Sequence, residues 1–225
     1  MAGQGEAVDR ITRSKAQARR FYDRISPWYD LLAGSSERRY KQQCLQQLQA
    51  AEGERVLEIG VGTGECSLAL ARSVGDSGHV HGIDISAGML AIARKKLARA
   101  GLAQRAEFNC ADACRLPYAA GAFDAVFSSF TLELFDIPDI ALVLGECLRV
   151  LRPGGRLCIT SLSKDARPGL MSRAYGWVHR RFPNIVDCRP IYVEQSIREA
   201  GFQIRNAQTL FMWGLPVSVV LAVKP

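Results

Sequence analysis

The chain has 225 residues, of which 48% are hydrophobic and 23% are charged. That length suits one domain with a full core, and the composition excludes a wholly disordered or collagen-like chain. Lys and Arg outnumber Asp and Glu by 29 to 22, which gives a net charge of +7. This balance is compatible with nucleic acid, anionic lipid or an acidic substrate as a partner, and equally with a solvated basic surface.

Neither a membrane span nor a secretory signal is visible in the sequence. The best apolar run, residues 215–223, is about half the length that a membrane helix needs, and it contains Pro216. The seven cysteines form no C-x-x-C pair, which favours reduced thiols over a disulfide scaffold or a zinc site. We therefore expect a cytoplasmic protein without a metal, while peripheral contact with a membrane stays open.

Apolar runs of strand length alternate with helical patterns from residue 55 onward. The expected strands are 55–59, 79–84, 106–110, 122–128 and 155–161. The expected helices between them are 65–74, 87–100 and 140–151. This alternation predicts a parallel sheet that helices cover on both faces.

The pattern changes after residue 163. Residues 167–182 look like an irregular helical insertion, and a helix at 193–200 ends at a glycine. Strands 202–210 and 217–223 then follow each other with no helix between them, so they must pair antiparallel.

Two helical stretches precede the sheet, at residues 14–24 and 37–49, and Pro27 separates them. We expect residues 1–50 to form a helical cap or lid that belongs to the same domain. The core then comprises residues 51–225, with a lid insertion near residues 165–190.

The strongest motif is VLEIGVGTG at residues 56–64, where a strand runs into three glycines and a helix follows. Glycine lets the backbone approach a ligand closely, and a helix N-terminus favours negative charge. A dinucleotide site would want a further glycine at position 65, but Glu65 stands there and would repel a pyrophosphate. The loop therefore suits a cofactor whose anion is a carboxylate.

Two acids follow the next two strands. Ligands of such sheets bind beyond the carboxyl ends of the strands, where Asp84 and Asp112 stand. Asp84 can accept two hydrogen bonds from a ribose diol, while Asp112 and the Ala113 N–H can bind a purine. The alternatives are a helix-capping role for Asp84 near Ser86 and a turn role for Asp112. A nucleoside joined to an amino acid, as in S-adenosylmethionine, fits this set.

Five segments in this order resemble the class I S-adenosylmethionine-dependent methyltransferases: 56–64, 82–90, 112–117, 123–128 and 148–155. The resemblance implies an α/β fold with a seven-stranded, mostly parallel, doubly wound sheet, an antiparallel last strand and a helical N-terminal cap. It also implies S-adenosyl-L-methionine as the cofactor. The cofactor-binding residues expected from motif and resemblance are Tyr22, Tyr29, Glu58, Gly60, Gly62, Gly64, Asp84, Ile85, Met89, Asp112, Ala113 and Ser128.

The aromatic stretch FYDRISPWYDLL at residues 21–32 and the basic stretch 37–41 resemble the ubiquinone/menaquinone-biosynthesis C-methyltransferase branch. In that branch an equivalent segment folds over the cofactor. Tyr22 and Tyr29 would then bind the cofactor carboxylate or close over the sulfonium, and packing within the lid is the alternative. Trp28 or Tyr29 would attract the sulfonium by cation–π interaction.

Methyl transfer from a sulfonium is an in-line displacement, so it needs positioning and water exclusion but no covalent protein intermediate. A carbon or oxygen acceptor would benefit from a base. Position alone makes candidates of Tyr22, Tyr29, His179, Asp30 and Glu133, and a solvated helix position is the alternative for His179.

We expect an enzyme that methylates a small, amphiphilic acceptor such as a polyprenyl quinol. The ethanolamine head group of a phospholipid is the alternative acceptor, and a non-catalytic cofactor-binding protein is the alternative class. The Asn-Pro-Pro-aromatic motif of many nucleic-acid and protein N-methyltransferases is absent, and no RNA-binding module is recognisable, so nucleic acid is not expected. Both a monomer and a homodimer fit the sequence.

Overall fold

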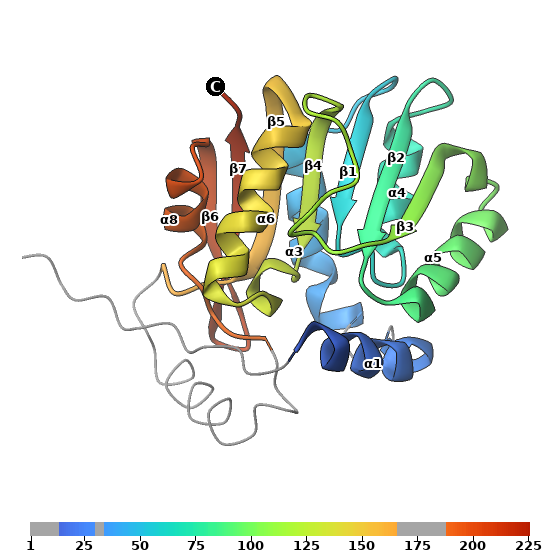
Figure 1. Cartoon of the computed structure of the whole chain (residues 1–225), viewed down its shortest axis with the longest axis horizontal. Coiled ribbons are helices and arrows are strands. Elements are labelled where there is room, and N and C mark those ends of the chain that lie inside the picture. Colours follow the sequence, from blue (N-terminus) through green and yellow to red (C-terminus); the bar gives the residue numbers. More distant parts are fainter. Residues whose placement is uncertain (1–13, 30–33, 166–187) are drawn as a thin grey trace, which may run out of the picture.

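A seven-stranded sheet forms the centre of the molecule (Figure 1). The computed structural model describes residues 14–29, 34–165 and 188–225. The strand order is β3-β2-β1-β4-β5-β7-β6, with β7 antiparallel to both of its neighbours and the first five strands parallel. The strands are β1 (Arg55–Ile59), β2 (His79–Asp84), β3 (Ala106–Cys110), β4 (Phe123–Ser129), β5 (Leu151–Leu162), β6 (Gln203–Met212) and β7 (Leu215–Val223). The predicted fold class is confirmed.

The helices cover both faces of the sheet, as predicted. α3, α4 and α5 contribute to the core on one face, while α6 and α8 contribute to the core on the other. The helical elements are α1 (Lys15–Ile25), η1 (Ser26–Trp28), α3 (Gly34–Leu48), α4 (Glu65–Ser73), α5 (Ala87–Arg99), η2 (Ala103–Arg105), η3 (Leu132–Leu134), α6 (Ile137–Val150) and α8 (Val193–Glu199). The insertion expected at residues 167–182 lies outside the described residues.

One strand boundary differs clearly from the prediction. β5 begins at Leu151, four residues before the expected start at residue 155. The added stretch contains Pro153 and Gly154, and the pairing of this part of β5 with β4 is irregular between Phe123 and Ala125. Proline and glycine are weak strand formers, so the sequence alone suggests a turn at this place.

The central strands are buried on both sides. Val56 and Phe127 face the α3, α4 and α5 layer, whereas Leu57 and Ile59 face the α6 and α8 layer. All four are at most 2% exposed. This double burial explains why the strands read as continuous apolar runs instead of alternating ones.

The first fifty residues divide between two places. α3 packs on the sheet, because Cys44 and Leu48 are fully buried in the same core cluster as Val56. α1 instead lies at one edge of the sheet, below β2, β3 and α5 (Figure 1), and none of its residues is fully buried. The structure thus separates a helix of the sheet layer from a helix at the edge.

That edge is where the parallel strands β1 to β5 end. β6 runs in the same direction as β5, since both are antiparallel to β7. The turn between β6 and β7, made by Trp213 and Gly214, therefore lies at the same edge as the carboxyl ends of the parallel strands (Figure 1). We call it the carboxyl edge.

Gly64 provides a test of how closely α4 and α5 pack. Gly64 has φ +80°, and a Cβ there would lie 2.7 Å from Ala93 Cβ. Gly101 has a similar φ of +71° but no atom within 4 Å of the added Cβ. We expect Gly64→Ala to lower the free energy of unfolding by about 2–4 kcal/mol and Gly101→Ala by about 1 kcal/mol, as measured by urea denaturation. Equal losses of unfolding free energy in the two variants would show that backbone strain alone, and not the contact with Ala93, requires glycine at position 64.

Candidate functional site

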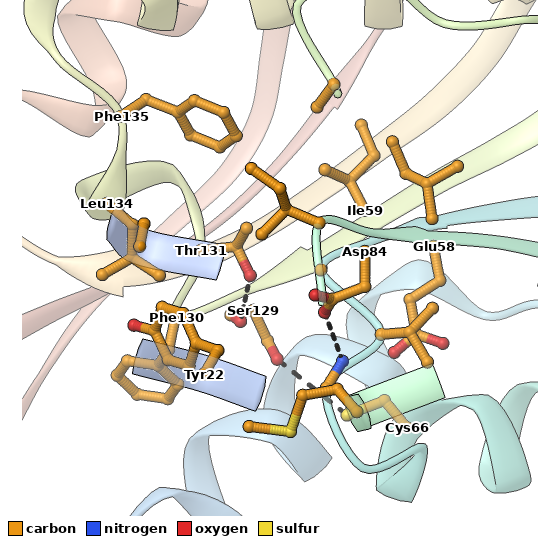
Figure 2. A pocket seen from close by; sticks show the side chains of 18 of the residues that line it. Tyr22, Glu58, Ile59, Cys66, Asp84, Ser129, Phe130, Thr131, Leu134 and Phe135 are labelled. Carbon is orange, nitrogen blue, oxygen red and sulfur yellow. Dashed lines mark hydrogen bonds between the residues drawn. The ribbon is translucent and has the colours of Figure 1, made fainter. Parts of the chain in front are cut away.

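A cavity opens at the carboxyl edge, beyond the ends of β1 to β4 (Figure 2). The β1–α4 loop, the end of β2, the segment after β3 and the segment after β4 supply its sheet side. Lys15, Ala18 and Tyr22 line it from α1, at the three- and four-residue spacing of one helix face. The topology therefore brings the predicted loop and both predicted acids to one place.

The three glycines of the loop have different tasks, although all have positive φ. A Cβ on Gly60 would clash with the side chain of Thr131, so Gly60 permits a close approach within the protein. Gly62 lines the cavity, and no atom lies within 4 Å of the place where its Cβ would be. Gly64 precedes α4 and does not line the cavity. The open space beside Gly62 is thus left for a ligand.

Asp84 fixes this loop. Its Oδ2 accepts a hydrogen bond from the Gly62 N–H at 2.8 Å, and its Oδ1 accepts one from the Ser86 N–H at 2.8 Å. Burial raises the pKa of Asp84, and the backbone N–H groups only partly offset that effect. Asp84 does not cap α5, because the Ser86 side chain does so by accepting from the Met89 N–H. The Asp84 carboxylate also lines the cavity, where it can accept a hydrogen bond from a ligand.

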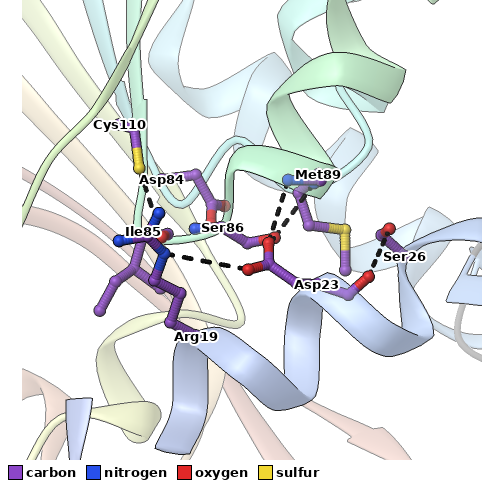
Figure 3. A network of polar contacts seen from close by, with 9 residues as sticks. Arg19, Asp23, Ser26, Asp84, Ile85, Ser86, Met89 and Cys110 are labelled. Atoms are coloured by element: carbon purple, nitrogen blue, oxygen red, sulfur yellow. Dashed lines mark hydrogen bonds and ion pairs between the residues drawn. The ribbon is translucent and has the colours of Figure 1, made fainter. Parts of the chain in front are cut away.

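Asp23 attaches α1 to the same point (Figure 3). Its Oδ1 accepts hydrogen bonds from Ser86 Oγ at 2.6 Å and from the Gly88 N–H at 3.0 Å. The hydrogen bond from Ser86 is the main reason why the pKa of Asp23 is lowered. A carboxylate at the first turn of α5 is also favoured by the helix dipole.

Lys15 reaches Asp112 from the other end of α1. Lys15 Nζ lies 2.7 Å from Asp112 Oδ2 and 3.3 Å from Asp139 Oδ2, and the Cys114 N–H donates to Asp112 Oδ1. Burial raises the pKa of Asp112, but the hydrogen bonds from Lys15 and Cys114 outweigh burial and leave the pKa lowered. Sequence reasoning missed Lys15, because nothing in the local pattern reveals a partner 97 residues away.

A second charged group at the cavity was also missed. Lys41 Nζ lies 2.9 Å from Glu37 Oε2 and 3.7 Å from Glu65 Oε2, and all three residues line the cavity. Burial lowers the pKa of Lys41, but the carboxylates of Glu37 and Glu65 outweigh burial and raise it. Lys41 thereby offsets part of the charge that Glu65 brings to the start of α4.

Glu58 lies behind the glycine loop as a buried acid. It lines the cavity and accepts a short hydrogen bond from Ser67 Oγ. Burial raises the pKa of Glu58 to about 8, although Ser67 and Lys41 act in the opposite direction. Its side chain is therefore mostly protonated near neutral pH, so it can donate a hydrogen bond as well as accept one.

The remaining wall is largely apolar. Phe130, Leu134 and Phe135 line it after β4, and Tyr22 lines it from α1 (Figure 2). Tyr29, which follows η1, also lines it. The rings of Tyr22 and Tyr29 meet edge to face, with their centroids 6.4 Å apart. The cavity therefore has a polar half at the strand ends and an aromatic half beside it.

Most of the other predicted site residues also line the cavity: Ile85, Met89 and Ala113 do so. Ser128 does not. Its hydroxyl donates to the Ile59 carbonyl at 3.1 Å, and Ser129 faces the cavity instead. Successive side chains of a strand point to opposite sides, so one position decides which serine meets a ligand.

Only some of the candidates for a general base line the cavity. Glu133 does not line the cavity, because its buried carboxylate accepts hydrogen bonds from Ser161 Oγ at 2.8 Å and the Leu162 N–H at 3.2 Å. Tyr22 and Tyr29 line the cavity, whereas Trp28 is 66% exposed and does not. His179 and Asp30 lie outside the described residues.

Neither a metal centre nor a membrane span is visible in the part of the chain that the structure describes. No group of three or more His, Cys, Asp or Glu side chains there is arranged to hold a metal ion. Among the same residues, no helix is both long and apolar enough to cross a bilayer.

Residues 56–155 match the family model described as a methyltransferase domain. That segment holds the glycine loop and both strand-end acids. The chain belongs to the class I S-adenosylmethionine-dependent methyltransferases, and S-adenosyl-L-methionine is its cofactor.

Within the class, the chain is similar to quinone-biosynthesis enzymes. It is 33% identical over 176 residues to the ubiquinone/menaquinone biosynthesis C-methyltransferase UbiE of Geobacter sulfurreducens, covering 76% of this chain and 68% of that protein. It is 32% identical over 169 residues to the demethylmenaquinone methyltransferase of Lactobacillus johnsonii, covering 72% of this chain and 67% of that protein.

Two solved structures share the fold. The cyclase SpnF matches with a TM-score of 0.76 and 23% identity, covering 95% of this chain and 97% of that one. An S-adenosylmethionine-dependent methyltransferase from Aquifex aeolicus matches with a TM-score of 0.63 and 20% identity, covering 95% and 100%. Because one of the two is called a cyclase, the fold by itself does not determine the reaction.

The position of Glu133 leads to a pH-dependent prediction. Burial raises its pKa in the folded protein to about 7 from an ordinary 4.5, so the folded state keeps a proton that the unfolded chain releases. The free energy of unfolding should therefore fall as the pH rises through this window. Relative to wild type, Glu133→Gln should gain on the order of 3 kcal/mol between about pH 4.5 and about pH 7 in urea denaturation.

Glu146→Gln is the matched control, because Arg149 lowers the pKa of Glu146. Its carboxylate stabilises the fold above the ordinary pKa, so this variant should lose stability at neutral pH and recover wild-type stability in acid. A pH profile of Glu133→Gln that runs parallel to wild type would contradict the assignment.

Proposed function

We propose that this methyltransferase acts on a quinol-like amphiphilic acceptor, which the aromatic half of the cavity holds beside the cofactor in the polar half. This proposal depends above all on one observation: the polar half and the aromatic half lie side by side in one cavity. Similarity to enzymes named for ubiquinone, menaquinone and demethylmenaquinone supports the same acceptor class.

The polar half fits the parts of S-adenosylmethionine. Asp84 offers its carboxylate to the ribose hydroxyls, and the open space beside Gly62 leaves room for the amino-acid part. Asp112 and the Ala113 N–H offer an acceptor and a donor to the adenine. The bound cofactor supplies an electrophilic methyl group.

Further residues shape this half. Ile85 and Met89 line the cavity with apolar side chains that suit the faces of a purine, and Glu58 lies behind the loop. Gly64 and Ser128 support the site without lining it: Gly64 allows α4 to approach α5, and Ser128 ties β4 to β1. Tyr22 and Tyr29 close the cavity from the N-terminal side.

The aromatic half suits an apolar ring. Phe130, Leu134 and Phe135 exclude water from one side and the two tyrosines from the other. Dry, fixed surroundings favour displacement at the methyl group, because the acceptor is held in a reactive geometry. Tyr22 and Tyr29 line this half, and their hydroxyls are the groups that we propose to orient a quinol hydroxyl.

The cofactor assignment is tested at Asp84. We expect Asp84→Asn to weaken S-adenosylmethionine binding about 10- to 100-fold in calorimetry, because a charge-assisted contact is lost. Asp124→Asn is the matched control, since Asp124 also accepts a backbone N–H, from Arg55 at 2.7 Å, but does not line the cavity. Equal affinities of the two variants would refute the role of Asp84.

The acceptor is tested by a screen that detects the mass gain of one methylene unit. Demethylmenaquinol analogues should be methylated, whereas phosphatidylethanolamine, simple thiols and small phenols should not. Leu134→Ala should raise KM for the quinol roughly tenfold, because apolar contact area is lost, and leave cofactor affinity unchanged. Leu142→Ala, on the exposed face of α6, is the control. Methylation of phosphatidylethanolamine alone would overturn the quinol proposal.

A further inference from the structure

Two aromatic side chains protrude from the β6–β7 turn at the carboxyl edge. Trp213 is 70% exposed and Phe211 is 57% exposed, although their neighbours Met212 and Leu215 are buried. Phe211 is tied to α3, because the Tyr40 hydroxyl donates to its carbonyl oxygen. The turn is therefore held in place while its rings face solvent.

The residue type at the turn is unfavourable for folding. Trp213 and Gly214 form a two-residue loop between paired Met212 and Leu215, with φ +50° and +80°. Such loops favour asparagine followed by glycine, because both positions have positive φ. A bulky side chain is disfavoured in this region, so the fold does not explain a tryptophan here.

Basic residues accompany these rings at the same edge. Arg20 and Arg24 are exposed and four apart on α1, so they share one helix face. Arg39 is exposed on α3 and stacks over the ring of Tyr40, the residue that holds Phe211. None of these three arginines forms an ion pair with another described residue.

A third exposed ring completes the surface. Trp28 follows α1 in η1 and is 66% exposed. We define the docking rim as six residues of the carboxyl edge: Arg20, Arg24, Trp28, Arg39, Phe211 and Trp213.

The geometry points to this docking rim as a surface that binds an anionic lipid bilayer. Tryptophan and phenylalanine insert at the boundary between head groups and acyl chains, and arginines attract anionic head groups. The rings stand on two separate elements with arginines nearby, which fits a charged planar surface better than one continuous apolar partner.

Docking by this rim would bring the carboxyl edge, where the cavity lies, to the bilayer. Lys15, Ala18 and Tyr22 line the cavity on one face of α1, and Arg20 and Arg24 are exposed on the same helix. At about 100° per residue the two arginines lie on the opposite side of α1 from the cavity, so this helix would stand between the bilayer and the cavity. Membrane binding itself does not depend on the proposed acceptor, because it is measured without one.

The key variant is Trp213→Asn, which supplies the residue that the turn prefers. It should keep or increase the melting temperature, and it should weaken cosedimentation with vesicles of phosphatidylcholine containing roughly one third phosphatidylglycerol by about tenfold. Leu142→Asn is the control, since Leu142 is 54% exposed on α6. It should bind these vesicles like wild type.

The electrostatic part is tested with Arg20→Gln/Arg24→Gln. This double variant should bind the vesicles at least tenfold more weakly, because each basic residue near the surface contributes about fivefold. Arg72→Gln/Arg99→Gln is the control with the same charge, because α4 and α5 return from the carboxyl edge and end at the opposite one. Added salt should weaken wild-type binding.

Several outcomes would overturn the inference. The inference is wrong if the wild-type protein does not bind the anionic vesicles, if added salt does not weaken this binding, or if the protein binds pure phosphatidylcholine vesicles equally well. Undiminished binding of Trp213→Asn would show that the rings play no part. A change from dimer to monomer in Trp213→Asn, with vesicle binding intact, would make the surface a contact between copies of the chain.

Discussion

Two backbone N–H groups converge on one half-buried carboxylate, and the geometry of the cavity depends on that convergence. Asp84 ends β2, so its bonds to Gly62 and Ser86 tie the glycine loop to the start of α5. Ser86 in turn donates to Asp23, which attaches α1 to the same point. One acid therefore aligns three segments that are distant in sequence, and its desolvated charge remains close to the cavity.

The sequence was sufficient for the features that follow from topology. Parallel strands end at one edge, so the loop at Gly62 and the acids Asp84 and Asp112 had to meet there. It was insufficient where a side chain can turn either way: Glu133 turns into the core toward Ser161, and Ser129 rather than Ser128 faces the cavity. Such choices depend on the final packing and not on a local pattern.

Contacts between segments that are distant in the sequence could not be predicted from it either. The contact of Lys15 with Asp112 joins residues 97 apart, and no periodicity or motif signals it. The matched family segment at residues 56–155 contains the strand-end acids but not α1. The matched segment thus holds the strand-end acids and also the aromatic residues after β4, whereas the N-terminal wall, with Tyr22 and Tyr29, lies outside it.

α1 contributes Lys15, Ala18 and Tyr22 to the cavity, yet it has no fully buried residue and is attached mainly by polar contacts. Since none of its residues is fully buried, we expect α1 to be less firmly held than the sheet side of the cavity. Spent S-adenosylhomocysteine has to leave before another turnover begins. We therefore expect the carboxylate contacts at the two ends of α1 to influence how quickly this product leaves.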